Sequence, residues 1–239
     1  MRRAMRLADD LYRIDGITGA NVYLVVAEDG LTLVDAGMPG NAETILAAIR
    51  AIGREPSELR RVVLTHSDPD HSGSAAQIKD LTGALVAIHA QDAPALAGRR
   101  PRRTDGTGAA PMRSSNIARV GHDLAMRLVF KLSGRFRDFR PVDADILLKD
   151  GDTISGLRVM HVPGHTRGSI ALYREDGVVF SGDALLADNG GRVQPPTDAL
   201  ALNPARALAS ADLIDSLGFT LLLPGHGQPV LRTREQQRR

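Results

Sequence analysis

Four short apolar runs of this chain each lead into a turn that carries histidine or aspartate, and this recurring pattern constrains the fold most. Short runs rich in Val, Leu and Ile between Gly and Pro are typical of buried strands. A side chain in the tight turn after such a strand is held rigidly, as a metal site requires. The four runs and their turns are 61–65 followed by HSDPDH (66–71), 153–161 followed by PGHT (163–166), 178–182 followed by Asp183, and 219–223 followed by PGHG (224–227).

Strand and helix signals alternate along the rest of the chain. The segment NVYLVVAEDGLTLVDAG (21–37) has Asp-Gly between two β-rich runs, which predicts a hairpin. Asn41 is the predicted N-cap of a helix over 41–52, where Ile and Ala recur on one face. Interspersed strands and helices predict a mixed α/β layered domain. The further predicted strands are 11–17, 21–27, 31–35, 85–89 and 169–174, and the further predicted helices are 74–81, 116–132 and 204–217.

One internal repeat concerns the two predicted hairpins. SIALYREDGVVFSGDA (169–184) follows the plan of residues 21–37: strand, Glu-Asp-Gly turn, strand, aspartate. Hairpins commonly look alike, so a chance likeness is the alternative. We expect two related halves that face each other, with a site where the halves meet.

Composition narrows the function further. The chain has 239 residues with 43% hydrophobic and 24% charged side chains, which suits one soluble domain over 1–239. Aromatic residues make up only 3%, too few for a base-stacking surface, so a nucleic-acid partner is not expected. There is no cysteine, which leaves only His, Asp and Glu to hold a metal. The basic N-terminus has no apolar signal-peptide run and no stretch approaches the ~18 apolar residues of a membrane span, so we expect a cytoplasmic protein.

Positive charge is concentrated in one segment. Residues 99–140 hold eleven Lys and Arg against three Asp, a net charge of +8, while the rest of the chain carries −6. Either this is a solvated surface insertion, or it draws an acidic substrate, a phosphate or an anionic lipid toward the site. The apolar stripe within 116–132 predicts a helix that packs on its own domain rather than on a membrane surface.

The hexapeptide His66-Ser67-Asp68-Pro69-Asp70-His71 carries the chemistry, with four ligand-type side chains in six residues. Pro69 biases Asp68 toward an extended conformation, so the loop can direct side chains to two metals at once. The helix that starts just after it offers backbone N–H groups near the carboxylates. Alternatively, Asp70 caps that helix, and the histidines of the other loops are ordinary turn residues. A single metal site explains all of these residues at once, whereas the alternative needs a separate explanation for each of them.

These segments resemble the metallo-β-lactamase superfamily, in particular its glyoxalase II-like hydrolases. The resemblance implies a four-layer αββα sandwich of two mixed sheets flanked by helices, with the site at one edge of the sheets. It also implies that the basic, partly helical insertion over 99–145 is a lid. The matching segments are LVDAG (33–37), LTHSDPDHSG (64–73), HVPGHTRGS (161–169), FSGDAL (180–185) and LLPGHG (222–227).

The resemblance also assigns ligands to two divalent metal ions. The implied ligands are His66, Asp68 and His165 for the first metal, Asp70, His71 and His226 for the second, and Asp183 as the bridge. Relatives usually have His at the position of Asp68, and the flavodiiron branch uses Glu. A further hard oxygen ligand shifts preference from Zn toward Fe or Mn, although Zn is the first expectation.

The function that the resemblance implies is hydrolysis of an ester, thioester or lactone by a metal-bridged hydroxide. Two metals would lower the pKa of a shared water to about 7. Asp70 and Asp183 are the predicted catalytic residues, Asp35 a predicted partner of a ligand histidine, and Asn189 and Arg192 predicted substrate contacts. The alternatives are a phosphodiesterase or nuclease and a di-iron redox protein acting with oxygen. We expect a small-molecule substrate, with a homodimer as one candidate assembly.

Overall fold

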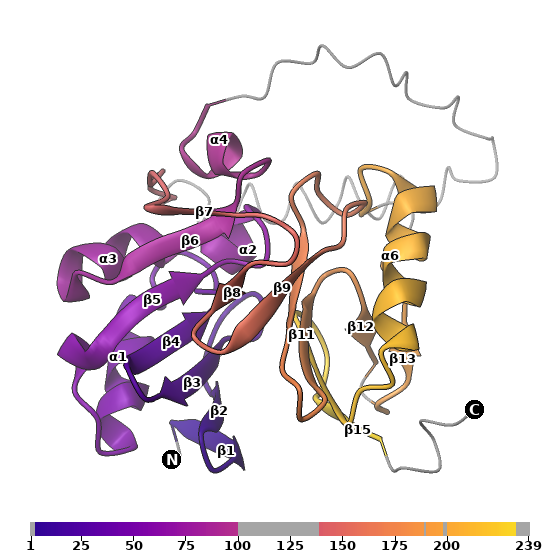
Figure 1. Cartoon of the computed structure of the whole chain (residues 1–239). Helices are drawn as coiled ribbons and strands as arrows, with labels where there is room; N and C mark the ends of the chain where they lie inside the picture. The colour runs from indigo at the N-terminus through magenta and orange to yellow at the C-terminus, as the bar shows by residue number, and fades with distance from the viewer. Residues whose placement is uncertain (1–2, 100–138, 189, 198–199, 233–239) are drawn as a thin grey trace.

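The computed structural model of the chain describes residues 3–99, 139–188, 190–197 and 200–232. Within these residues two mixed β-sheets lie face to face, and helices cover the outer face of each sheet (Figure 1). The first sheet has the order β1-β2-β3-β4-β5-β6-β7, and the second has the order β15-β14-β11-β10-β9-β8. This arrangement confirms the predicted four-layer αββα sandwich.

The elements have the following bounds. The first sheet contains β1 (Ala4–Ala8), β2 (Leu11–Ile14), β3 (Tyr23–Ala27), β4 (Gly30–Val34), β5 (Leu59–Val63), β6 (Leu85–His89) and β7 (Ile146–Leu148). The second contains β8 (Thr153–Ile154), β9 (Leu157–His161), β10 (Ile170–Tyr173), β11 (Val178–Gly182), β14 (Leu221–Pro224) and β15 (Val230–Leu231), while β12 (Leu186–Ala187) pairs with β13 (Val193–Gln194). The helices are α1 (Ala42–Ala51), the 3-10 helix η1 (Pro56–Glu58), α2 (Pro69–Ser72), α3 (Ala75–Thr82), α4 (Ala93–Leu96) and α6 (Pro204–Ser216).

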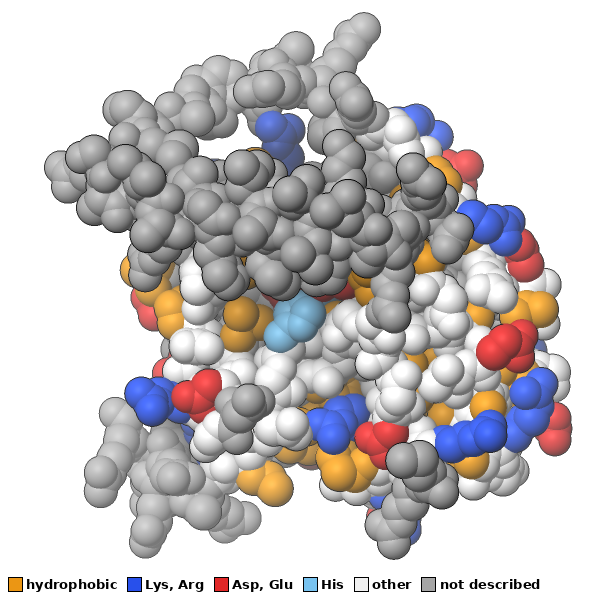
Figure 2. Space-filling view, turned by 180° about the vertical axis from the view of Figure 1, so that it is seen from behind, with side chains coloured by type: hydrophobic (Ala, Val, Ile, Leu, Met, Phe, Trp, Pro, Cys, Tyr) orange, Lys and Arg blue, Asp and Glu red, His pale blue; other side chains and the backbone are white. Residues whose placement is uncertain are grey.

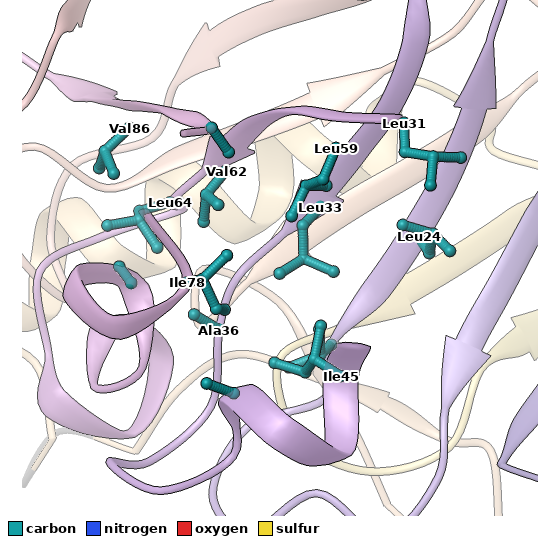
Figure 3. Close-up of a cluster of buried hydrophobic side chains, with 14 of the residues drawn as sticks. Leu24, Leu31, Leu33, Ala36, Ile45, Leu59, Val62, Leu64, Ile78 and Val86 are labelled. Atoms are coloured by element: carbon teal, nitrogen blue, oxygen red, sulfur yellow. The ribbon is translucent and has the colours of Figure 1, made fainter. Parts of the chain in front are cut away.

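Three buried apolar clusters separate the four layers. Figure 3 shows the first, in which Leu24, Leu33 and Val62 of the first sheet pack against helices that carry Ile45 and Ile78. A second cluster lies between the two sheets, and a third lies between the second sheet and α6. Because side chains alternate across each strand, every central strand contributes to two clusters, which fixes the register of both sheets.

The internal repeat seen in the sequence forms corresponding hairpins, one in each sheet. β3 pairs antiparallel with β4, which pairs parallel with β5. In the second sheet β10 pairs antiparallel with β11, which pairs parallel with β14. Both hairpins therefore end next to a parallel neighbour, and the aspartates that follow them, Asp35 and Asp183, leave their sheets in equivalent positions.

Two local predictions are wrong. The segment 153–161 forms two strands, β8 and β9, because Ser155 and Gly156 adopt positive φ values of 51° and 74° and make a tight turn. Asn41 stands at the N-cap of α1, but its side chain makes no capping bond. Its amide donates instead to the carbonyl oxygens of Thr18 and Met38, so it ties two loops together.

Other predictions lie outside the described residues. The predicted helix over 116–132 and most of the predicted lid over 99–145 belong to this group. Directly after that segment, β7 adds a parallel edge strand to β6. Every helix in the described part of the chain is too short or too polar to span a bilayer.

Candidate metal centre

The structure brings the seven predicted ligands together at one end of the two sheets. Each comes from a segment that follows a buried strand: the loop and α2 after β5 supply four of them, and the loops after β9, β11 and β14 supply one each. These residues form two groups, and within each group the possible ligand atoms all lie within 4.8 Å of one another. The first group is His66, His165 and Asp183, and the second is Asp70, His71 and His226.

Asp68 lies beside the first group. Its Oδ2 is 3.2 Å from Nε2 of His165 and 3.7 Å from Nε2 of His66. The Asp68 backbone is extended, with ψ of 142°, as the following Pro69 dictates. The side chain therefore leaves the loop on the side of the first group, while Asp70 and His71, within the single turn of α2, belong to the second.

Asp183 lies between the two groups. Its Oδ2 is 3.5 Å from Nε2 of His165 in the first group. Its Oδ1 is 3.2 Å from Nε2 of His71 and 3.6 Å from Nε2 of His226 in the second. One carboxylate thus turns one oxygen to each group, which is the geometry of a bridging ligand.

Several buried polar atoms of this cluster lack a hydrogen-bond partner within the described residues. Burying a polar atom without a partner is unfavourable, so such atoms need an explanation. Nitrogen and carboxylate oxygen together suit Zn, Fe or Mn, and the residues present therefore fit a pair of divalent ions. The atoms are His66 Nε2, His71 Nε2, His165 Nδ1 and Asp183 Oδ1.

Electrostatics within the cluster point the same way. Burial would raise the pKa of Asp68, but the His165 hydrogen bond and the charge of His66 outweigh it and hold that pKa at about 2. Burial opposes a charge on His71, yet the carboxylates of Asp183 and Asp35 raise the pKa of its ring well above the usual range. The pKa values of His165 and His226 are also raised, so protons on these three rings favour the carboxylates in the absence of metal, and bound cations would take their place.

Asp35 occupies the position predicted for a partner of a ligand histidine. It is buried, and its Oδ2 accepts a hydrogen bond from Nδ1 of His71 at 2.8 Å. Its Oδ1 accepts from the backbone N–H of Thr65 at 2.8 Å. With Nδ1 protonated, Nε2 of His71 is left as the acceptor that faces the second group. The φ of +60° at Asp35 is unusual for a residue with a side chain, and these contacts hold it there.

Two residues that support the loops were missed at the sequence level. The side-chain amide of Asn21 donates to the carbonyl oxygens of Pro224 and Gly227, on either side of His226. Asp92, buried after β6, accepts hydrogen bonds from the loops that hold the first group. Both act on residues more than 20 positions away, so no local pattern could have revealed them.

The predicted substrate contacts are placed less centrally. Asn189 lies outside the described residues. Arg192 has an 85% exposed side chain and pairs with Asp188 at 3.5 Å. It lines a cavity of about 880 Å³ together with Asp215 at the carboxyl end of α6, whereas the loop of His165 contacts the opposite end of that helix through Asn203. A substrate contact by Arg192 therefore stays a prediction.

Comparison with known proteins identifies the family. The family model described as the metallo-beta-lactamase superfamily matches residues 15–226. The chain belongs to this superfamily. Members similar to it are metal-dependent hydrolases, and the chain is accordingly an enzyme of that class.

Three curated relatives illustrate the range of similarity. The uncharacterized protein YobT of Bacillus subtilis is 28% identical over 91% of this chain and 87% of its own length. Acyl-coenzyme A thioesterase MBLAC2 of Gallus gallus is 33% identical over 70% of this chain and 57% of its own length. Hydroxyacylglutathione hydrolase of Xanthomonas euvesicatoria is 28% identical over 86% of this chain and 60% of its own length.

Solved structures share the fold. BJP-1, a subclass B3 metallo-beta-lactamase of Bradyrhizobium japonicum, is 25% identical with a TM-score of 0.63, covering 94% of this chain and 77% of the other. TTHA1623 in a di-iron-bound form is 27% identical with a TM-score of 0.62, covering 89% of each chain. The fold is thus shared with a metallo-beta-lactamase and with a protein solved in a di-iron-bound form.

Proposed function

We propose that this chain is a thioester hydrolase that works with two divalent metal ions. The observation that carries the proposal is the placement of Asp183, whose two carboxylate oxygens face separate groups of possible ligands. When bound, the two ions would supply an acidified water as the nucleophile and polarise the carbonyl oxygen of the substrate. No serine or cysteine nucleophile is needed for such chemistry.

The relatives support a thioester in particular. Acyl-coenzyme A and hydroxyacylglutathione, named in two of them, are both thioesters. The leaving group of a thioester is a thiolate, and a thiol has a pKa of about 8.5, far below that of an alcohol. A thiolate therefore leaves without a strong general acid, which suits a cluster whose histidines are occupied as ligands.

The chain's own residues define the side from which a substrate approaches. Side chains of Asp68, Asp70 and His226 are 45%, 33% and 41% exposed, whereas those of His66 and His71 are buried. Figure 2 shows histidine surface reaching solvent on one face of the molecule. A substrate carbonyl would meet the cluster from the side of the exposed Asp68 and His226, and Asp70, paired with His226 at 3.2 Å, would orient the attacking water.

The test combines metal analysis with a matched panel of substrates. Acyl-coenzyme A and acylglutathione thioesters are compared with their oxoester, a lactone and a phosphodiester, on protein whose metal content is measured by elemental mass spectrometry. We expect about two ions per chain and fastest turnover of the thioesters. Replacement Asp183→Ala should lower turnover by more than about 100-fold, since the carboxylate that faces both sets of predicted ligands is lost. Near-normal turnover by that variant, or preference for the phosphodiester, contradicts the proposal.

A second candidate function rests on Asp68. A carboxylate in this position adds a hard oxygen ligand, and the similar TTHA1623 binds two iron ions. In that case the cluster would hold iron and react with oxygen. Two Fe per chain together with oxygen consumption in the presence of a reductant would favour this alternative over hydrolysis.

A further inference from the structure

We propose that Asp92 is a positioning residue that holds the loops of the first ligand group in place across the two sheets. Asp92 lies in the turn after β6, at the start of α4, and its side chain is buried. It is not one of the possible ligands. The inference rests on the proposed metal centre and deepens it by assigning the support of one of the two metal positions.

The contacts of Asp92 join two separate loops. Oδ2 accepts from the backbone N–H of Ser67 at 3.0 Å and from Oγ1 of Thr166 at 2.8 Å, and Oδ1 accepts from the N–H of Gly168 at 2.7 Å. Ser67 stands between His66 and Asp68 in the loop from the first sheet. Thr166 follows directly after the other predicted ligand of the first ion, in a loop from the second sheet. One carboxylate thus joins the two loops that carry the three residues assigned by the resemblance to the first ion.

Gly168 provides a second, independent observation. A Cβ at this position would lie 2.7 Å from both the backbone nitrogen and Oδ1 of Asp92, closer than real side chains approach. Glycine at 168 is therefore needed for the loop to reach the carboxylate. The backbone N–H of Gly168 is therefore close enough to donate to Asp92 only because residue 168 has no side chain.

The second group has different supports. His71 is held by Asp35, whose Oδ2 accepts a hydrogen bond from Nδ1 of the imidazole. The loop of His226 is held by Asn21. Loss of the Asp92 carboxylate should therefore weaken one ion position much more than the other.

The experiment measures metal affinity as well as activity. Asp92→Asn keeps the size of the side chain but leaves only one acceptor oxygen for three donors. Zn²⁺ affinities are measured by chelator competition on metal-free protein. The measurement is made in wild type and in two variants that each retain one ion position: His226→Ala retains the first, and His165→Ala retains the second. We expect Asp92→Asn to lower the Zn²⁺ affinity of the first position, measured in His226→Ala, by about 10- to 100-fold. It should lower the affinity of the second position, measured in His165→Ala, by less than about threefold.

Two further variants guard against a trivial result. Asp145→Asn is the matched control, because Asp145 also accepts from a backbone N–H, that of Val86, but pairs with Lys79 away from the cluster. It should leave both affinities unchanged. Should Asp92→Asn not fold, Thr166→Val, which removes a single bond to Asp92, should still weaken the first ion selectively.

The outcomes separate this inference from the proposed function. If a folded Asp92→Asn protein binds both ions with wild-type affinity, or loses affinity for both to the same extent, the positioning role is overturned and the proposed hydrolase is untouched. Selective weakening in a protein that binds two ions but does not cleave thioesters would support the positioning role and sink the thioesterase. Wild-type protein that binds no ion would overturn both.

Discussion

Asp35 and His71 form a buried pair in which Nδ1 of the imidazole lies 2.8 Å from Oδ2 of the carboxylate. On the other side of the same ring, Nε2 lies 3.2 Å from Asp183. The two aspartates follow the two equivalent hairpins, one in each sheet, so His71 is enclosed by the repeated element of both halves. The orientation of this ring is therefore fixed before any metal binds.

Replacement of Asp35 should act through His71. In Asp35→Asn the amide cannot accept all of the hydrogen bonds from His71 and Thr65, and the histidine loses its fixed tautomer. We expect the second ion to bind about 10- to 100-fold more weakly, measured by chelator competition. Asp29→Asn, in the exposed turn of the same hairpin, is the control and should bind both ions normally. Unchanged affinity in Asp35→Asn would refute the role of this pair.

Asp68 should influence which metal binds. Imidazole suits Zn better than a carboxylate does, while carboxylates suit Mn. Asp68→His should therefore raise the ratio of Zn to Mn affinity, on the order of tenfold. Competition between the two ions at equal free concentration, followed by elemental analysis, measures the ratio. A ratio that does not rise would mean that Asp68 does not contact the ion.

Metal binding should release protons. In the metal-free chain burial opposes the charged forms of His71 and His165, but neighbouring carboxylates raise both pKa values. Their contribution to stability is therefore present below pH ~6.5 and is lost as the pH rises through the raised values. Because an ion needs the neutral rings, Zn²⁺ affinity should rise with pH, up to about tenfold per unit for each proton released. Calorimetry in buffers of different ionisation enthalpy counts these protons, and identical heats in all buffers would disprove their release.

The stacked pair of His89 and His161 should make the fold sensitive to acid. Their ring centroids are 4.2 Å apart with an interplanar angle of 9°. Burial and the neighbouring His161 lower the pKa of His89. A lowered pKa in the folded state gives stability that is present above pH ~6.5 and is lost as the pH falls through the folded value. Urea unfolding of metal-free protein at pH 7.5 and 5.5 should show a smaller acid loss in His89→Gln than in wild type, whereas parallel losses would exclude this origin.

Gly225 should tolerate no side chain. A Cβ there would overlap Oδ1 of Asp183 and lie 2.6 Å from Cε1 of His71. Gly225→Ala should lower the free energy of unfolding by about 1–3 kcal/mol and reduce metal occupancy. Gly40→Ala is the control, since its Cβ meets open space and only the φ of +93° is strained. That variant should lose about 1 kcal/mol with full metal content, and a Gly225→Ala protein with normal occupancy would contradict the steric argument.

The clustering of the seven predicted ligands could be anticipated because their sequence signals are local. The loop of His66 to His71 and the PGH turns around His165 and His226 place chemistry directly after apolar strands, and the structure brings them together. The same pattern predicted a mixed α/β layered domain, whereas the four-layer αββα sandwich was implied by the resemblance to the metallo-β-lactamase superfamily. That these side chains bind metal remains a prediction, to be decided by the experiments above.

What escaped prediction depends on contacts between distant residues. Asp92 has no motif, and its role emerges only when Ser67 and Gly168 meet it from two sheets. Asn41 had the right residue type for a cap, yet neighbouring loops offered its side chain better partners. Gly156 indicates the turn within 153–161, but the apolar residues on both sides of it favoured the prediction of one continuous strand.

The distribution of the ligands over the two sheets has a further consequence. Residues up to 99 supply four of the seven predicted ligands, and residues from 139 onward supply the other three. Neither half of the chain could build a complete cluster alone, even if it folded. Metal occupancy would then indicate that the two halves have packed together correctly. A nascent or cleaved chain would have no activity until its two sheets had packed against each other.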